Sequence, residues 1–164
     1  VNVGWELGSS LMSESVDAII GAYFTHESIS LDNEGYPVTV FRMENWGVPD
    51  YYELVLVTSE KFLSENPEIV ERFVRAVSKG YQDAIKDPQA GVDILKKYEP
   101  EIDENIDRPG AALLKEFWQD EKGDFGRQTL QKWKNFSDWM QDKNLLPASV
   151  NPKEAFTDKY SLKE

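Results

Sequence analysis

Two short segments combine aromatic side chains with a carboxylate, and they are the best candidates for chemistry in this sequence. The first, residues 21–27 (GAYFTHE), contains Tyr23 and Glu27, and the second is residues 45–53 (NWGVPDYYE). An aromatic face contributes about 0.5 to 1.5 kcal/mol in stacking beyond the area it buries, and a carboxylate accepts hydrogen bonds from amino groups. Both segments therefore suit a flat, nitrogen-rich ligand, and the alternative that these aromatics are core or turn residues stays open. The candidates in the second segment are Trp46, Tyr51 and Tyr52.

Most catalytic and metal-binding patterns are absent from the sequence. There is no Cys, and His26 is the only His, so cysteine nucleophiles and Cys-rich zinc sites are excluded. Neither a G-x-S-x-G elbow nor a glycine-rich phosphate loop occurs. The acidic run at residues 99–104 lacks an EF-hand pattern and is interpreted as a solvated turn. We therefore expect no cofactor and no metal, and we interpret His26 as a solvated neighbour of Glu27.

Composition narrows the class of protein further. The chain has 164 residues, with 18 Lys and Arg against 30 Asp and Glu, which gives a net charge of −12. This charge repels phosphate backbones, so nucleic acid is not an expected partner. An apolar content of 40% argues against disorder, and no apolar run approaches the roughly 20 residues of a membrane span. The length suits one domain or a piece of a larger one.

Three apolar segments precede the helical part of the chain and are predicted to be strands. They are residues 16–22, 38–43 and 53–57. Continuous apolar runs of this kind are typical of strands that are covered on both faces, as in a parallel sheet. A short helix is predicted between residues 9 and 15, with Ser9 or Ser10 as its cap. Ligands bind beyond the carboxyl ends of such strands, which is where residues 23–27 would lie.

Four helices are predicted in the remaining sequence. Pro67 follows Asn66, a good N-cap, and apolar residues then recur at three- and four-residue spacing to Ile85. Asp87 and Pro88 repeat that signature for a second helix that ends before Pro100. Two more helices are predicted at residues 110–121 and 127–142, with solvated connections at 99–107 and 120–124 and a loosely packed tail from residue 151. The fold class predicted from these patterns is α/β with a helical C-terminal end.

The first residues read as the middle of a strand. The opening sequence VNVGW has no initiator Met, no charged region and no apolar leader. We therefore expect these 164 residues to be the C-terminal part of a longer protein.

Several of these segments resemble one family of receptors. Residues 15–23 (SVDAIIGAY) with Glu27, and residues 46–57 (WGVPDYYELVLV), look like the C-terminal half of the thiamine-precursor substrate-binding proteins, the ABC-transporter receptors for hydroxymethylpyrimidine and formylaminopyrimidine. The helix that begins at Asn66 and Pro67 is shared with sulfonate, nitrate and taurine receptors, so it indicates only the superfamily. The resemblance covers about residues 1 to 100.

The resemblance implies a two-lobed type II periplasmic-binding-protein (Venus flytrap) fold. Residues 1–35 would be the end of lobe two and the hinge crossing, and residues 36–164 the returning part of lobe one. Such a receptor is not an enzyme. It would be extracytoplasmic, either periplasmic or lipid-anchored, and it would hand a small pyrimidine ligand to the ABC permease subunits. The ligand-binding residues implied are Glu27, Tyr23, Tyr52, Tyr51 and Trp46, although Trp46 is also a candidate for packing at the hinge.

Two alternatives remain beside this interpretation. A receptor of the same fold could carry another flat heterocycle such as riboflavin. The eukaryotic hydroxymethylpyrimidine phosphate synthases share the fold but use a Cys-rich segment just before the strand that corresponds to residues 53–57. The positions there read VPDYY, and the absence of Cys disfavours that chemistry.

Overall fold

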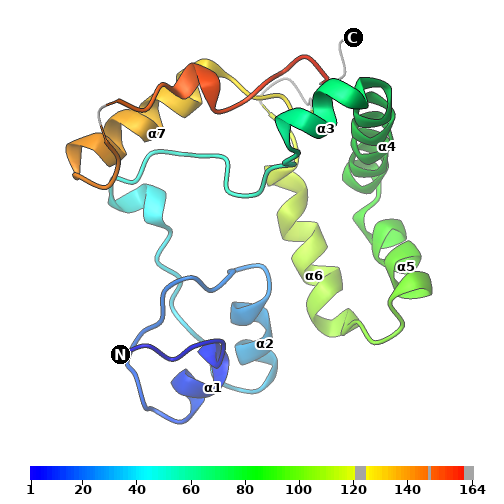
Figure 1. Cartoon of the computed structure of the whole chain (residues 1–164). Helices are drawn as coiled ribbons and strands as arrows, with labels where there is room; N and C mark the ends of the chain where they lie inside the picture. Colours follow the sequence, from blue (N-terminus) through cyan, green and yellow to red (C-terminus); the bar gives the residue numbers. More distant parts are fainter. Residues whose placement is uncertain (121–124, 148, 161–164) are drawn as a thin grey trace. The chain divides into compact units, whose positions relative to one another are not determined.

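The computed structural model describes residues 1–120, 125–147 and 149–160. The chain splits into two compact units and passes from one to the other three times, after Val40, after Tyr81 within helix α4 (Pro67–Lys86) and after Gln119. Unit 1 comprises Val1–Val40 and Gln82–Gln119, and unit 2 comprises Phe41–Tyr81 and Asp120–Glu164 (Figure 1).

Unit 1 is built from short helices. Helix α2 packs against both α1 and α6, and α6 packs against α5 and continues into the short 3-10 helix η2. Figure 1 shows α5 and α6 as neighbours joined by a short connection. The bounds of these elements are α1 Leu7–Met12, α2 Glu27–Asn33, α5 Pro88–Tyr98, α6 Glu104–Leu114 and η2 Lys115–Phe117.

A close backbone contact joins α6 to the loop before α2. Gly110 is buried in α6, and a Cβ atom at this position would lie 2.5 Å from the carbonyl oxygen of Thr25. Only a residue without a side chain allows this approach. One end of the contact is reinforced by Phe24 and Phe117, whose rings meet edge to face with 5.7 Å between centroids. The loop that leads into α2 is therefore held by α6.

Pro109 lies inside α6 and contributes to the same contact. Proline has no N–H to donate, so it leaves the carbonyl of Asn105, four residues earlier, without its helical partner. The side-chain amide of Asn33, at the end of α2, donates a hydrogen bond of 3.3 Å to this carbonyl. The helical bond that Pro109 removes is thus replaced by one between α6 and α2.

Unit 2 is organised around α7 (Leu130–Asp142). Thr129 caps this helix by accepting a hydrogen bond from the backbone of Lys132, and Ser59 caps α3 (Glu60–Glu65) in the same way. The other elements are the larger part of α4 and the 3-10 helices η1 (Met43–Trp46) and η3 (Pro152–Glu154), and η3 packs against α7.

The helix predictions are confirmed most closely where a cap marks the start. Helix α4 begins at Pro67, and α5 begins at Pro88 with the Asp87 carboxylate accepting a hydrogen bond of 3.0 Å from Ala90. The fourth helix begins at Leu130, later than predicted, and ends at Asp142 as predicted.

Other helix predictions need correction. Helix α6 begins at Glu104 with Asp103 as its cap, because Pro109 is accommodated inside the helix and does not mark its start. The last part of the predicted connection at 99–107 is therefore helical. Helix α1 follows Glu6, not Ser9 or Ser10. The tail was predicted to be loosely packed from residue 151, but within its described part Phe156 stacks on Trp133. Residues 121–124 of the predicted connection at 120–124 lie outside the described residues.

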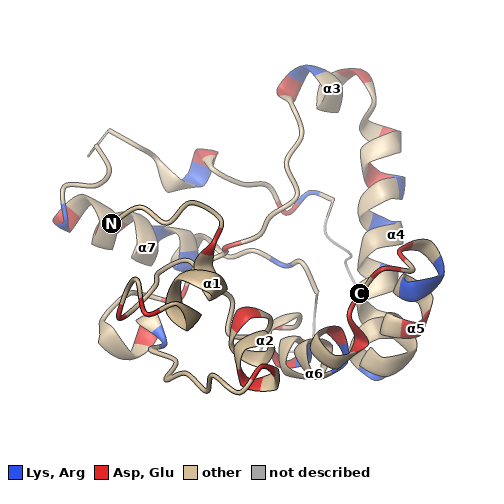
Figure 2. Ribbon diagram, turned by 90° about the horizontal axis from the view of Figure 1, so that it is seen from below, with Lys and Arg blue, Asp and Glu red and all other residues tan. Residues whose placement is uncertain are grey.

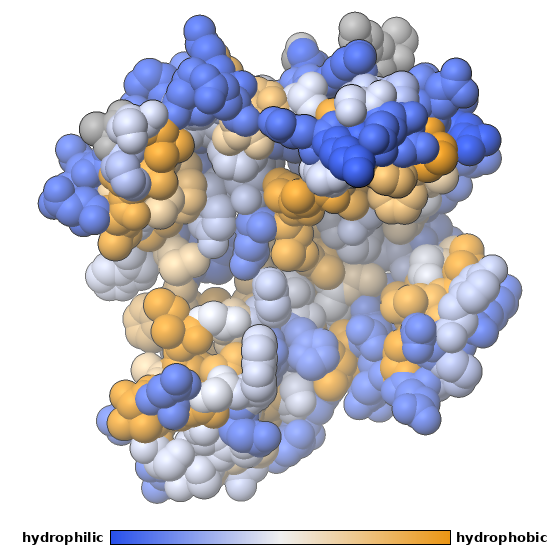
Figure 3. All heavy atoms as spheres, viewed as in Figure 1, coloured by the Kyte–Doolittle hydropathy of each residue, from blue (hydrophilic) through white to orange (hydrophobic). Residues whose placement is uncertain are grey.

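The three predicted strands are absent from the described residues, and this part of the α/β prediction is wrong for them. A strand exists only when a neighbouring segment completes its ladder of hydrogen bonds, and no described segment pairs with residues 16–22, 38–43 or 53–57. Many of their apolar side chains are therefore exposed to solvent. Leu31 and Val92 are the only large apolar side chains that are buried among the described residues, and orange apolar patches interrupt the hydrophilic surface in Figure 3.

Candidate functional site

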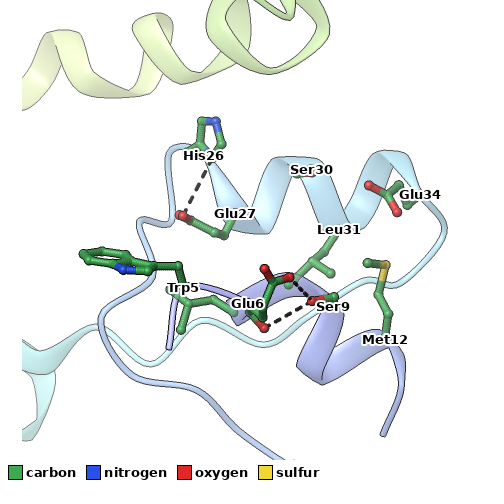
Figure 4. Close-up of a pocket in the computed structure, with 11 residues that line it drawn as sticks. Trp5, Glu6, Ser9, Met12, His26, Glu27, Ser30, Leu31 and Glu34 are labelled. Carbon is green, nitrogen blue, oxygen red and sulfur yellow. Dashed lines mark hydrogen bonds and ion pairs between the residues drawn. The ribbon is translucent and has the colours of Figure 1, made fainter. Parts of the chain in front are cut away.

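Unit 1 contains a pocket of about 260 Å³ between α1 and α2. One end of it combines an aromatic ring with carboxylates, and Figure 4 shows Trp5 and Glu27 at that end, with Met12 and Glu34 at the other. The lining residues are Trp5, Glu6, Leu7, Gly8, Ser9, Met12, His26, Glu27, Ser30, Leu31 and Glu34.

Glu27 is the one sequence-predicted site residue that lines this pocket. It is the first residue of α2, and its Oε2 accepts a hydrogen bond of 2.7 Å from the backbone N–H of Tyr23. The backbone N–H of Glu27 donates in turn to the carbonyl of Tyr23 at 2.9 Å. These two reciprocal bonds close the loop before α2 and fix the direction of the carboxylate, as a capping box does. The His26 Nδ1 atom lies 3.8 Å from the other oxygen, Oε1.

Trp5 and Glu6 form the facing edge of the pocket. Gly4 has a φ of 60°, a conformation that glycine adopts readily, so the chain turns sharply before α1. The Trp5 side chain remains 98% exposed. The Ser9 hydroxyl donates a hydrogen bond of 2.9 Å to Oε2 of Glu6, which positions this carboxylate between α1 and α2 (Figure 4). The pocket thus presents an uncovered ring and oriented hydrogen-bond acceptors.

Tyr23 lies beside the pocket and acts on it through its backbone. Its N–H orients Glu27, while its side chain is about half exposed and is not among the lining residues. Contact between the Tyr23 ring and a ligand stays a prediction.

Tyr51 and Tyr52 belong to unit 2 and pack against α7. The ring of Tyr51 stacks on Phe136 with 4.6 Å between centroids. The Tyr52 hydroxyl accepts a hydrogen bond of 2.9 Å from the backbone N–H of Thr129. Its ring also lies 5.8 Å from that of Trp133. Both tyrosines therefore help to hold the 50–53 segment on α7, and their contact with a ligand stays a prediction.

Lys132 strengthens this attachment of the 50–53 segment. Its ammonium group lies 2.5 Å from Oδ2 of Asp50 and 4.6 Å from the centre of the Tyr52 ring. The ion pair and the cation–π contact hold two residues of the segment to one residue of α7.

Trp46 also belongs to unit 2. It ends η1, and its ring makes a tilted contact with Phe41 at 6.1 Å while the side chain stays 73% exposed. Its role, whether ligand contact or hinge packing, stays a prediction.

Sequence reasoning missed Trp5, Glu6 and Glu34 and treated His26 as a solvated neighbour. His26 is indeed exposed and beside Glu27, but it also lines the pocket. A signal for Trp5 and Glu6 was available, because an aromatic residue and a carboxylate stand directly before a helix there, as they do at residues 23–27.

No group of His, Asp and Glu side chains suited to a metal ion occurs in the described residues. Within the same residues, none of the helices combines the length and the apolar character that a membrane crossing needs.

The family model described as NMT1/THI5 like matches residues 1–91, which is more than half of the chain. The chain belongs to the NMT1/THI5-like family. This family has a periplasmic-binding-type fold, which is consistent with the α/β class predicted from the sequence. The resemblance noted from residues 15–23 and 46–57 is thereby confirmed.

Curated relatives of this NMT1/THI5-like chain include two that are named as binding proteins. A formylaminopyrimidine-binding protein of Halalkalibacterium halodurans is 30% identical over 96% of the chain and 49% of its own length. The riboflavin-binding protein RibY of Chloroflexus aurantiacus is 28% identical over 96% of the chain and 46% of its own length. A putative thiamine biosynthesis protein of Haemophilus influenzae is 27% identical over 94% of the chain and 48% of its own length. The chain spans about half the length of these relatives.

Proposed function

We propose that the protein is the solute-binding receptor of an ABC importer and captures a thiamine-related pyrimidine, either hydroxymethylpyrimidine or formylaminopyrimidine. The observation that carries this proposal is one pocket in which the oriented carboxylate of Glu27 and the uncovered ring of Trp5 occur together. The relative named formylaminopyrimidine-binding protein supports the same class of ligand.

The chemistry of the pocket matches an aminopyrimidine. The face of Trp5 offers a stacking surface for a flat ring, and the Glu27 carboxylate accepts a hydrogen bond from an exocyclic amine. A hydrogen bond to a charged group contributes about 1.5 to 3 kcal/mol. Because the Tyr23 N–H already fixes the carboxylate, little side-chain freedom is lost when the ligand binds.

We also propose how these residues belong to the complete receptor. Residues 1–35 end lobe two and enter the hinge, and residues 36–164 form the returning part of lobe one. Segments 16–22, 38–43 and 53–57 become strands when the rest of each sheet pairs with them. In the last segment Leu54 and Val57 are 82% and 86% exposed, and burial of each side chain would contribute about 1.5 to 3 kcal/mol.

The receptor carries out no reaction in this proposal. It closes two lobes around the pyrimidine and delivers it to the permease subunits of the importer, which requires an extracytoplasmic location, either free or lipid-anchored. Tyr51, Tyr52 and Trp46 are its proposed ligand contacts from lobe one, and Tyr23 lines the cleft from lobe two.

Calorimetric titration of the full-length protein with hydroxymethylpyrimidine, formylaminopyrimidine and thiamine tests the proposal. We expect heat of binding with at least one of the two pyrimidines, together with a change in Trp fluorescence. Absence of both signals with both pyrimidines would overturn the assignment. Incubation with pyridoxal phosphate, histidine and iron provides the enzyme control, and no pyrimidine product is expected.

Riboflavin is the second candidate, since the relative RibY is named as a riboflavin-binding protein. The relative named formylaminopyrimidine-binding protein is 30% identical to the chain and RibY is 28% identical, so the pyrimidine is the first candidate. Riboflavin in the same titration series distinguishes the two.

A further inference from the structure

The pocket of unit 1 is lined by three carboxylates and by no Lys or Arg. Glu6, Glu27 and Glu34 supply the negative charges, and the imidazole of His26 is the only other titratable group that lines it. Residues 1–41 contain six Asp and Glu but no Lys or Arg, so half of the net charge of −12 lies in this segment. Figure 2 shows acidic positions in red on α2.

Two of these carboxylates have no cationic partner. Glu6 is oriented by the neutral hydroxyl of Ser9, and neither Glu6 nor Glu34 forms an ion pair with any described residue. By contrast, Glu104 in the same unit pairs with both Lys96 and Arg108. Glu6 and Glu34 are both exposed, and no described Lys or Arg neutralises either of them.

We propose that Glu6 and Glu34 are specificity-determining residues that admit uncharged heterocycles and exclude their phosphate esters. This inference rests on the proposed function of the pocket and adds a selection between two forms of the same ligand. A phosphate monoester carries a charge of about −1.5 to −2 at pH 7, so it is repelled by uncompensated carboxylates. A ligand without the phosphate carries no such charge, so it is not repelled and keeps its affinity.

Two pairs of ligands isolate the effect of the phosphate. Hydroxymethylpyrimidine is compared with its phosphate monoester, and riboflavin with riboflavin 5′-phosphate, by calorimetric titration of the full-length protein at low salt. The readout is the ratio of the dissociation constant of the ester to that of the free alcohol. We expect a ratio of at least about ten for the pair that binds. The ratio should fall at 1 M salt, where the Debye length is about 3 Å.

Glu6→Gln and Glu34→Gln test the two residues separately. A glutamine at position 6 still accepts a hydrogen bond from Ser9, so the local structure is retained while the charge is removed. Each substitution should lower the ratio of the two dissociation constants by about three- to ten-fold. This is the size expected for a screened short-range charge interaction. Glu101→Gln, at an exposed position of unit 1 outside the pocket, is the matched control and should leave the ratio unchanged.

The outcomes separate this inference from the proposed function. If the pyrimidine and its ester bind equally well, the selection by charge is wrong and the receptor assignment stands. If only riboflavin binds, and its phosphate is rejected, the pyrimidine assignment is wrong and the selection by charge is supported. A purely structural role of Glu6 would weaken both members of a pair equally, and an unchanged ratio in both glutamine variants would overturn the role of the two residues. Absence of binding by these four compounds and by formylaminopyrimidine would overturn both proposals.

Discussion

In unit 1 the ring of Trp5 is almost wholly exposed at the edge of a pocket, whereas in unit 2 the ring of Trp133 is packed among other side chains. Trp133 stacks on Phe156 at 5.9 Å, and its ring N–H donates a hydrogen bond of 2.8 Å to Gln128. A residue whose ring and polar atom both have partners contributes to stability. A residue whose ring has no packing partner leaves that ring available to stack on a ligand. The difference indicates that aromatic residues of the same type have separate tasks in the two units.

The sharpest test of this comparison replaces each tryptophan in turn. Trp133→Ala should lower the free energy of unfolding by about 2 to 4 kcal/mol, somewhat less than for a fully buried ring, because Trp133 is half-buried. Trp5→Ala should change it by less than about 0.5 kcal/mol but weaken pyrimidine binding. Denaturant unfolding and calorimetric titration of the full-length variants measure the two effects. Equal loss of stability in both variants would remove the distinction between the units.

A second test addresses the carboxylate that the loop before α2 orients. Glu27→Gln should weaken pyrimidine binding by about 1.5 to 3 kcal/mol, which is the scale of a hydrogen bond to a charged group. Glu65→Gln at an exposed position of α3 in unit 2 is the matched control and should bind normally. Titration calorimetry provides the dissociation constants. Unchanged affinity in Glu27→Gln would place this residue outside the ligand site.

A third test sharpens the comparison by asking what supports the pocket. Gly110→Ala places a Cβ atom against the Thr25 carbonyl, so we expect a loss of about 1 to 3 kcal/mol in the free energy of unfolding. Gly80→Ala in α4 meets no atom within 4 Å and should stabilise the protein by about 0.5 to 1 kcal/mol, because alanine favours helix. Thermal or denaturant unfolding measures both changes in the free energy of unfolding and distinguishes the expected loss in Gly110→Ala from the expected gain in Gly80→Ala. A neutral Gly110→Ala variant would mean that α6 does not hold the loop before α2.

The smallest expected effect concerns a carboxylate of unit 2 that, unlike Glu6 and Glu34, has a cationic partner. The pKa of Glu44 is lowered first by a hydrogen bond from its own backbone N–H and then by the side chain of Arg42. A lowered pKa in the folded state contributes stability above the ordinary pKa of glutamate, and this is lost as the pH falls through the lowered value. In Arg42→Ala the pKa of Glu44 should rise but stay below its ordinary value. Titration of the Glu44 carboxyl carbon by NMR measures this, and an unchanged pKa would contradict the contribution of Arg42.

Local signals in the sequence were enough to predict the starts of α4 and α5. A cap at Asp87 and a proline at the next position act within one turn, so no distant residue is needed to specify them. The start of helix α6 was misplaced because the helix contains Pro109, and the Asn105 carbonyl that this proline leaves without a helical partner accepts a hydrogen bond from Asn33, which is distant in sequence. The predicted strands failed for a related reason, since a strand is specified by its partner as well as by its own residues.

The candidate site was predicted in part. Glu27 was found because aromatic residues and a carboxylate occur together in one short segment. Trp5 and Glu6 were missed because they reach the same pocket from another element, and packing of α1 on α2 is not visible in a local pattern. The partners of Tyr51 and Tyr52 on α7 were equally hidden, because those contacts span more than 70 positions of sequence.

The absence of Lys and Arg from residues 1–41 has a practical consequence for experiments on the pocket. Trypsin cuts only after these residues, so every residue that lines the pocket stays on one peptide that ends at Arg42. No lysine is available there to amine-reactive reagents, whereas carbodiimide coupling can modify Glu6, Glu27 and Glu34. Mass spectrometry of that single peptide, with and without ligand, would report occupancy of the pocket without a change in the sequence.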